Sequence, residues 1–463
     1  MNRDSWRGSK DWENEGLPLS TGSDHACKLY DAAITQYTGW YEDSLFGGLQ
    51  KTIESIKATD PNFVMGHVLS VGLNLVGAGR SKRLDKLFQK EIDDLCSLSQ
   101  SQKFLTNREK QHVEAVKLWS EGLLDEATIV WEDILLHHPE DILALKLAYI
   151  TYFYQGKSTQ MRDSVARVMP YWKIHNPLHS YLYGLYAFGL EETNLYRKAE
   201  TMAITGLEMN SKDAWATHTL AHVYEMEGRV TDGINLFSST ESDWVSCGML
   251  ATHNFWHWCL CYIEKSEYEA AFDIFDREIS KRMKAGTMLN IVDATSLLYR
   301  LELEGCNVKD RWNEVHNICA PHIEDHLLAF YDIHLLMSCL GGKQEESLQK
   351  FLDTIELGRS NKVYNNTWNI QEKLCKAFVA YNNGDYETTV NLLHPIRYEI
   401  IKIGGSHAQR DVFNLLLISA AIKSPLTAHH KIARNLLIER KASKENSPMT
   451  ERLIAKALAC HAD

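Results

Sequence analysis

Apolar residues recur every three or four positions along almost the whole chain, and short polar turns interrupt them about every dozen residues. The stretch EAVKLWSEGLLDEATIVWEDIL, residues 114–135, is typical. This spacing places apolar side chains on one face of a helix. The turns carry glycine with Asn, Asp or Glu, as in YNNGDYETT at 381–389 and MEGRVTDG at 226–233. The pattern therefore predicts a chain of antiparallel helical hairpins.

The hairpins share a common register within a length of 34 residues. Small residues such as Ala115, Ala221 and Ala377 fall at the same place in their segments, where they let two helices approach closely. The register resembles the tetratricopeptide repeat, in which each hairpin buries its apolar face against its neighbours. We predict an all-α fold of such hairpins stacked into a right-handed superhelix with one concave surface. The clearest repeats are 108–141, 180–213, 214–247, 252–285 and 370–403.

The repeats do not reach either end of the chain. We predict an N-terminal segment at 1–29, a repeat array at 30–403 and a C-terminal helical cap at 404–463. In the cap, GGSHAQRDVF at 404–413 predicts a glycine turn and a helix that begins with a capping box of Ser406 and Gln409. Helix N-termini attract anions, so Arg410 is a candidate ligand-binding residue. The alternative is a capped helix with Arg410 in an ordinary ion pair.

Composition excludes several classes of protein. The chain has 61 acidic and 49 basic residues, and its formal charge of −12 opposes nonspecific attraction to DNA or anionic lipid. Asp332 and His334 interrupt the stretch LLAFYDIHLLMSCLGG, so no run reaches the ~18 apolar residues of a membrane helix. The first residues are polar, and ten scattered cysteines indicate reduced thiols. We predict a cytoplasmic protein without nucleic-acid binding or membrane insertion.

Six longer stretches, spread from residue 17 to 457, are more specific than the repeat. They resemble the tetratricopeptide repeat protein 38 family. This resemblance implies a predominantly helical cytoplasmic protein and brings no established reaction or substrate. The stretches are LPLSTGSDHACKLYDAAITQY, DPNFVMGHVLSVGL, MRDSVARVMPYW, HNFWHWCLCYIEKSEYEAAFDIFD, GGSHAQRDVFNLLL and SPMTERLIAKA.

Two neighbouring hairpins each carry histidines four residues apart, in HTLAHVYE at 218–225 and HNFWHW at 253–258. Residues at this spacing share one face of a helix. The repeat register gives Leu220 and Ala221 to packing, which leaves His218, His222 and Glu225 on the concave face. The same register places further residues on or beside that surface, namely His112, Trp215, His253, Trp256 and His257.

This histidine set fits more than one chemistry. Imidazoles and a carboxylate suit zinc or another divalent metal, so His218, His222, Glu225 and His253 are candidate metal ligands. Without a metal, the same four residues are candidate catalytic acids and bases of a small-molecule, hydrolase-like enzyme. No nucleophile motif or cofactor fingerprint accompanies them, so the sequence leaves open whether the protein is an enzyme.

The function that we predict first is the binding of a ligand or a partner. In this hypothesis a His/Trp-lined concave groove binds a peptide, a protein or a small molecule. An open groove favours a peptide, whereas closure by segments 1–60 and 404–463 favours small-molecule chemistry. A purely structural alternative remains, in which these side chains bond one another or backbone carbonyls between packed helices.

Overall fold

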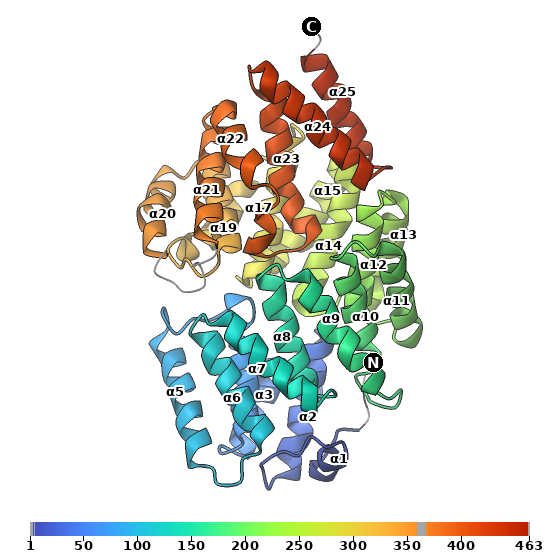
Figure 1. Ribbon diagram of the computed structural model, residues 1–463, viewed down its shortest axis with the longest axis vertical. Helices are drawn as coiled ribbons and strands as arrows, with labels where there is room; N and C mark the ends of the chain where they lie inside the picture. The colour runs from blue at the N-terminus through green and yellow to red at the C-terminus, as the bar shows by residue number, and fades with distance from the viewer. Residues whose placement is uncertain (1–2, 4, 359–366, 462–463) are drawn as a thin grey trace. The chain divides into compact units, whose positions relative to one another are not determined.

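The structure, a computed structural model, describes residues 3, 5–358 and 367–461. Within these residues every regular element is a helix, and consecutive helices form hairpins joined by short turns (Figure 1). The predicted all-α fold of stacked helical hairpins is therefore confirmed.

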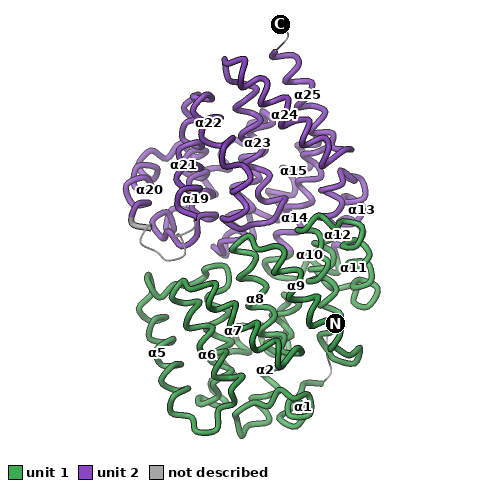
Figure 2. The backbone as a smooth tube through the Cα atoms, in the orientation of Figure 1, with its two compact units in different colours: residues 1–219, 242–250 green, residues 220–241, 251–463 purple. Residues whose placement is uncertain are grey.

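The chain forms two compact units, which Figure 2 distinguishes by colour. Unit 1 comprises residues 1–219 and 242–250, and unit 2 comprises residues 220–241 and 251–463. Three consecutive helices contribute residues to both units, so each of them is a continuous element shared by the two. These helices are α12 (Ala214–Met226), α13 (Val230–Trp244) and α14 (Gly248–Glu264).

Side-chain caps lie at the start of helices in unit 1. Thr106 and Glu109 form a capping box at the start of α6, and Asp141 accepts a hydrogen bond from the Ala144 backbone at the start of α8. The helices are α1 (Ser9–Asn14), α2 (Asp24–Gly39), α3 (Leu49–Thr59), α4 (Val64–Leu75), α5 (Lys86–Ser101), α6 (Asn107–Ser120), α7 (Leu124–His137), α8 (Ile142–Tyr154), α9 (Ser158–Val168), α10 (Tyr181–Glu191) and α11 (Tyr196–Met209), with short 3₁₀ turns η1 (Val76–Ala78) and η2 (Met169–Tyr171).

Unit 2 continues the same pattern to the C-terminus. The predicted capping box of Ser406 and Gln409 is present at the start of α23. The helices are α15 (Tyr268–Ile274), α16 (Ser280–Met283), α17 (Met288–Leu303), α18 (Arg311–Cys319), α19 (Ala329–Gly341), α20 (Glu345–Gly358), α21 (Trp368–Asn382), α22 (Tyr386–Leu393), α23 (His407–Lys423), α24 (Thr427–Ser443) and α25 (Pro448–Cys460), with a π turn η3 (Phe275–Ile279) and the 3₁₀ turns η4 (Ala320–His322), η6 (His394–Ile396) and η7 (Ile400–Ile403).

Three of the five predicted hairpins turn at a glycine. Gly122, Gly228 and Gly384 follow the first helix of three predicted repeats, and their φ angles of 77°, 71° and 78° lie in the left-handed region. Glycine enters this region without a steric penalty, which explains why it ends the first helix of a hairpin. Each of the five predicted repeat segments contains such a pair of helices.

Equivalent helices of successive hairpins bond one another at a nearly constant sequence separation. Thr219 donates to the Gly184 carbonyl across 35 residues, and Gln371 donates to Asp332 across 39. The side chain of Trp256 donates to Ser296 across 40 residues. These bonds show how each hairpin packs on the next, as expected of a helical repeat.

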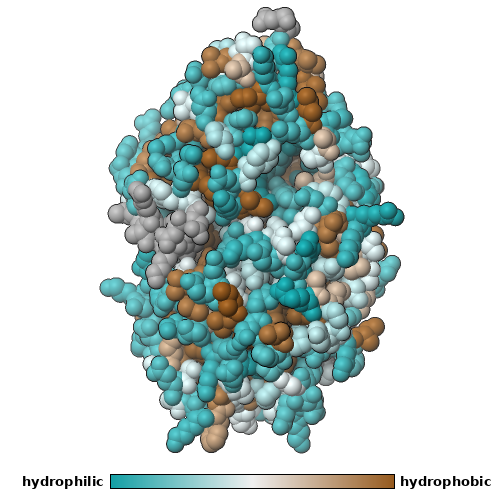
Figure 3. Space-filling view, in the orientation of Figure 1, coloured by the Kyte–Doolittle hydropathy of each residue, from teal (hydrophilic) through white to brown (hydrophobic). Residues whose placement is uncertain are grey.

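The face of the molecule in Figure 3 is mainly polar. The face in Figure 3 carries mostly hydrophilic side chains, with apolar ones scattered among them. Among the described residues, no helix combines the length and the apolar character needed to cross a bilayer.

Candidate functional site

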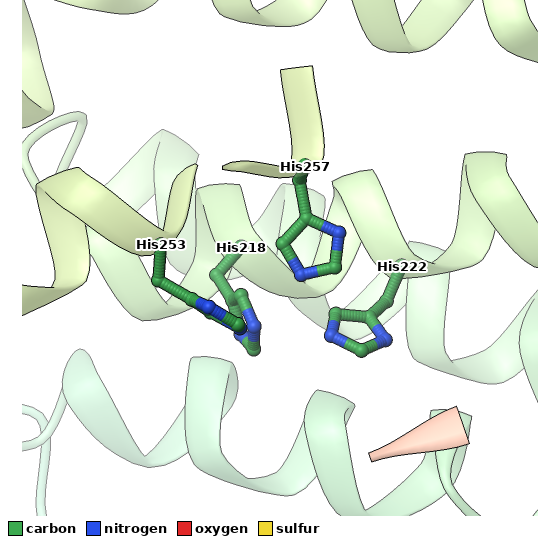
Figure 4. A group of neighbouring side chains, drawn as sticks. All are labelled: His218, His222, His253 and His257. Carbon is green, nitrogen blue, oxygen red and sulfur yellow. The ribbon is translucent and has the colours of Figure 1, made fainter. Parts of the chain in front are cut away.

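Four buried histidines meet on helices α12 and α14. His218 and His222 lie one turn apart on α12, and His253 and His257 lie one turn apart on α14. One possible ligand nitrogen from each ring lies within 4.8 Å of the other three (Figure 4). We call this set the histidine cluster. It includes His257, which the repeat register had placed at the side of the concave surface.

The spacing between the rings approaches that of a metal site. The ring centroids of His222 and His257 are 4.4 Å apart, and those of His253 and His257 are 4.8 Å apart. Four nitrogens bound tetrahedrally to one ion at about 2.1 Å lie about 3.4 Å apart. Inward side-chain movements of up to about 1 Å would therefore bring all four ligand atoms into one coordination sphere.

Two histidines of the cluster are oriented by buried carboxylates. His253 Nδ1 lies 2.8 and 3.0 Å from the two carboxylate oxygens of Asp293, and His257 Nδ1 lies 3.2 Å from Glu225 Oε2. An ionised carboxylate only accepts hydrogen bonds, so each Nδ1 is the donor and each Nε2 carries the lone pair. Carboxylate-backed imidazoles of this kind are typical of metal ligands, because the partner fixes the ring and raises its basicity.

Glu225 also lies near a buried ion pair, formed by Lys444 and Glu264. Lys444, between α24 and α25, places its Nζ 3.1 Å from Glu264 and 3.8 Å from Glu225. Burial raises the pKa of the Glu225 carboxyl, and the positive charge of Lys444 opposes that rise. Glu264 also accepts hydrogen bonds from Ser447 Oγ and the Met449 backbone. The C-terminal segment thus contacts the residue that orients His257.

The helix after the cluster supplies a polar stripe. Asp293, Ser296 and Arg300 follow one another at helical spacing on α17 and face α14. Asp293 bonds His253, Ser296 accepts the indole N–H of Trp256 at 3.1 Å, and the Arg300 guanidinium lies 5.6 Å from the Trp256 ring centroid. The Trp256 ring stacks on His253 at 5.0 Å, with an interplanar angle of 10°.

The residues predicted for the concave groove are buried. None of the nine candidate ligand-binding residues is more than 9 % exposed. Helix α12 is buried on both its packing face and its histidine face, which excludes an open groove at this helix, whereas the enclosed alternative stays a prediction. The repeat register identifies the face that packs within the array, but it does not reveal what covers the other face.

Three individual predictions also need correction. Glu225 was predicted as a metal ligand, but it lies behind His257 as a hydrogen-bond partner. Trp256 was predicted to face the groove, but it is completely buried and bonds Ser296. His112 lies on α6 and bonds Asp141, which also pairs with Arg108, so it belongs to a separate ion network and not to the cluster.

The last two candidates, Trp215 and Arg410, are also buried. The ring of Trp215 contacts His218 at 5.9 Å and lies beneath the ammonium of Lys146 at 4.5 Å. Burial lowers the pKa of Lys146 to about 7, although Asp213 opposes the fall. Arg410 lies in the first turn of α23 and donates to the Gly405 carbonyl.

Sequence reasoning missed Asp293, Arg300 and Lys444. A signal existed for the first two, since they are isolated charges seven residues apart in the otherwise apolar stretch NIVDATSLLYRL. Charged residues on one face of a buried helix require partners, which marks that face as polar inside the core. Lys444 carried no comparable signal, because its partner Glu264 lies 180 residues earlier.

A distant structural likeness exists among solved proteins. No family model matches the chain, so membership of the tetratricopeptide repeat protein 38 family stays a prediction. The chain is similar to the Rap protein in a crystal structure of Rap complexed with competence and sporulation factor. The two are 12 % identical with a TM-score of 0.43, and the match covers 73 % of this chain and 99 % of that one. We therefore derive function from the chain's own residues.

Proposed function

We propose that this protein holds a divalent transition-metal ion in the histidine cluster and uses the enclosed site to act on a small molecule. The observation that carries the proposal is the convergence of four imidazoles, two of them backed by buried carboxylates. Imidazole donors suit zinc, copper, iron and nickel, whereas calcium and magnesium prefer oxygen. An ion that keeps a coordination position open beside the four imidazoles would supply Lewis acidity and would lower the pKa of a bound water.

Burial favours a small-molecule substrate. Because His222 and Trp256 are fully buried, a peptide has no open surface of these residues on which to lie. Peptide or protein binding elsewhere on the helical repeats stays a prediction. Metal-free acid/base chemistry is the closest competitor, since the pairs His253–Asp293 and His257–Glu225 also orient imidazoles for proton transfer.

Elemental analysis of untagged protein, purified without chelators, tests the metal site. We expect about one transition-metal ion per chain. A His222→Ala/His257→Ala variant removes one ligand from each helix and should hold less than about 0.1 ion per chain. The matched control is His25→Ala/His175→Ala, which removes two exposed histidines and should leave the metal content unchanged.

A low metal content of the wild-type protein would contradict the proposal. If the wild-type protein holds less than about 0.1 ion per chain after zinc, iron, copper and nickel are offered and the excess is removed, the metal proposal fails. Circular dichroism of both double variants separates loss of ligands from loss of fold.

A further inference from the structure

Arg300 is a buried cation that forms no contact ion pair with any residue that the structure describes. It lies on α17 and is only 3 % exposed. Its Nη2 donates to the Ala408 carbonyl at the start of α23, and its Nε donates to no acceptor in the described part of the chain. A buried guanidinium normally has a carboxylate partner, because its desolvation is costly.

The nearby carboxylates are already committed to other cations. Asp411 pairs with Arg440 through two hydrogen bonds, of 2.5 and 2.9 Å. Glu264 pairs with Lys444 at 3.1 Å. Burial lowers the pKa of Arg300, and the negative charge of Asp411 opposes this fall. Asp411 is too far from Arg300 to form an ion pair with it. The positive charge of Arg300 is therefore not neutralised at close range by the described residues.

The surroundings of Arg300 suit an anionic group. Gly404 and Gly405 have φ angles of 87° and 79°, and they lead into the N-terminus of α23, whose backbone dipole favours negative charge. Arg410 adds a second cation in the first turn of that helix. The charge of Arg300 also contributes to lowering the pKa of His334 to about 4, although burial is the main cause.

We propose that Arg300 binds the carboxylate or phosphate group of a small-molecule ligand beside the histidine cluster. Guanidinium binds both groups through paired N–H donors, and a buried site strengthens such a bond. Trp256 contacts both His253 and Arg300, so the anion site adjoins the proposed metal site. This inference rests on the proposed function, because the ligand that Arg300 binds is taken to be the substrate of the proposed metal site. It states that this substrate is an anion.

Thermal unfolding of chelator-treated full-length protein tests the anion site independently of the metal. The probes are inorganic phosphate and acetate, with sodium chloride at equal ionic strength as the reference. We expect Tm to rise with one of the two anions, with the logarithm of its concentration above Kd, by about 3 °C at a hundredfold excess over Kd for a chain of 463 residues. The anion that acts distinguishes a phosphate from a carboxylate ligand.

Two Arg300 variants and one control make the outcome decisive. Arg300→Met should abolish the anion-dependent rise, and its Tm without anion should equal or exceed that of the wild type, because an uncompensated buried charge is gone. Arg300→Lys keeps the charge without the paired donors and should reduce the rise. Arg434→Met, at an exposed position, should leave the rise unchanged.

The inference is overturned if neither anion raises the Tm of the wild type, or if Arg300→Met responds as the wild type does. A fall in the anion-free Tm of Arg300→Met, without any anion response in the wild type, would assign Arg300 a purely structural role. Metal content measured on the same samples keeps the two proposals separate. An anion response without bound metal would sustain this inference while the metal proposal fails.

Discussion

Replacing Lys146 with methionine should stabilise the protein at neutral pH. Lys146 is 3 % exposed on the apolar helix α8, and its ammonium lies over the rings of Trp215 and Tyr37 at 4.5 and 5.1 Å. A fall in its pKa from 10.5 to about 7 corresponds to an upper bound of about 5 kcal/mol of destabilisation. Attraction to the two rings reduces this cost, so we expect a gain of about 1 to 4 kcal/mol.

The dependence of this gain on pH follows from the direction of the pKa change. The pKa of Lys146 is lower in the folded than in the unfolded protein, so the unfolded chain binds more protons between about pH 7 and 10.5. The wild type therefore gains stability as pH rises through this window, whereas the methionine variant lacks this contribution. Their difference should be largest at and below pH 7 and should vanish near pH 10.5.

Urea unfolding of both proteins at pH 7, 8, 9 and 10 measures the difference. Lys51→Met is the matched control, because Lys51 is 65 % exposed and its loss should change stability by less than about 0.5 kcal/mol. Equal or lower stability of Lys146→Met at pH 7, with no pH dependence of the difference, would refute the reasoning.

Three further perturbations test other parts of the site. Glu225→Gln removes the carboxylate behind His257 and should weaken metal binding about 10- to 100-fold, measured against a competing chelator; unchanged affinity would exclude its orienting role. Glu264→Ala leaves Lys444 buried without its main partner and should cost about 3 to 5 kcal/mol in urea unfolding; a cost below about 1 kcal/mol would contradict the buried pair. Ser406→Ala removes the cap of α23 and should lower stability by about 1 kcal/mol, whereas no loss would show that the hydrogen bond from the Gln409 backbone to Ser406 Oγ does not stabilise the fold.

The sequence predicts the helical hairpins because their causes are local. Apolar spacing, turn glycines and capping residues act within a few positions, and the structure confirms the hairpins and the cap at Ser406. The proximity of His222 and His253 could also be predicted from the sequence, because the register aligns neighbouring helices. The limits of the segments 1–29, 30–403 and 404–463 remain predictions.

The details of the site depend on contacts that the register does not contain. Whether Glu225 coordinates an ion or supports His257 is decided by side-chain orientation, which helical spacing leaves open. Burial of the histidine face requires covering segments whose position no local pattern reveals. Arg300 is a further example, because an isolated charge in an apolar helix indicates a polar site but does not identify the group that pairs with the charge.

The hydrogen bonds of Glu264 have a consequence for synthesis of the chain. Its partner Lys444 follows 180 residues later. At about 5 to 20 residues per second, the ribosome needs roughly 10 to 40 s to add those residues. During that interval the C-terminal end of α14 lacks the groups that neutralise its carboxylate. A chain that stops before Lys444 never acquires them, so the buried partners of the helix that carries His253 and His257 are complete only after Lys444 has been added.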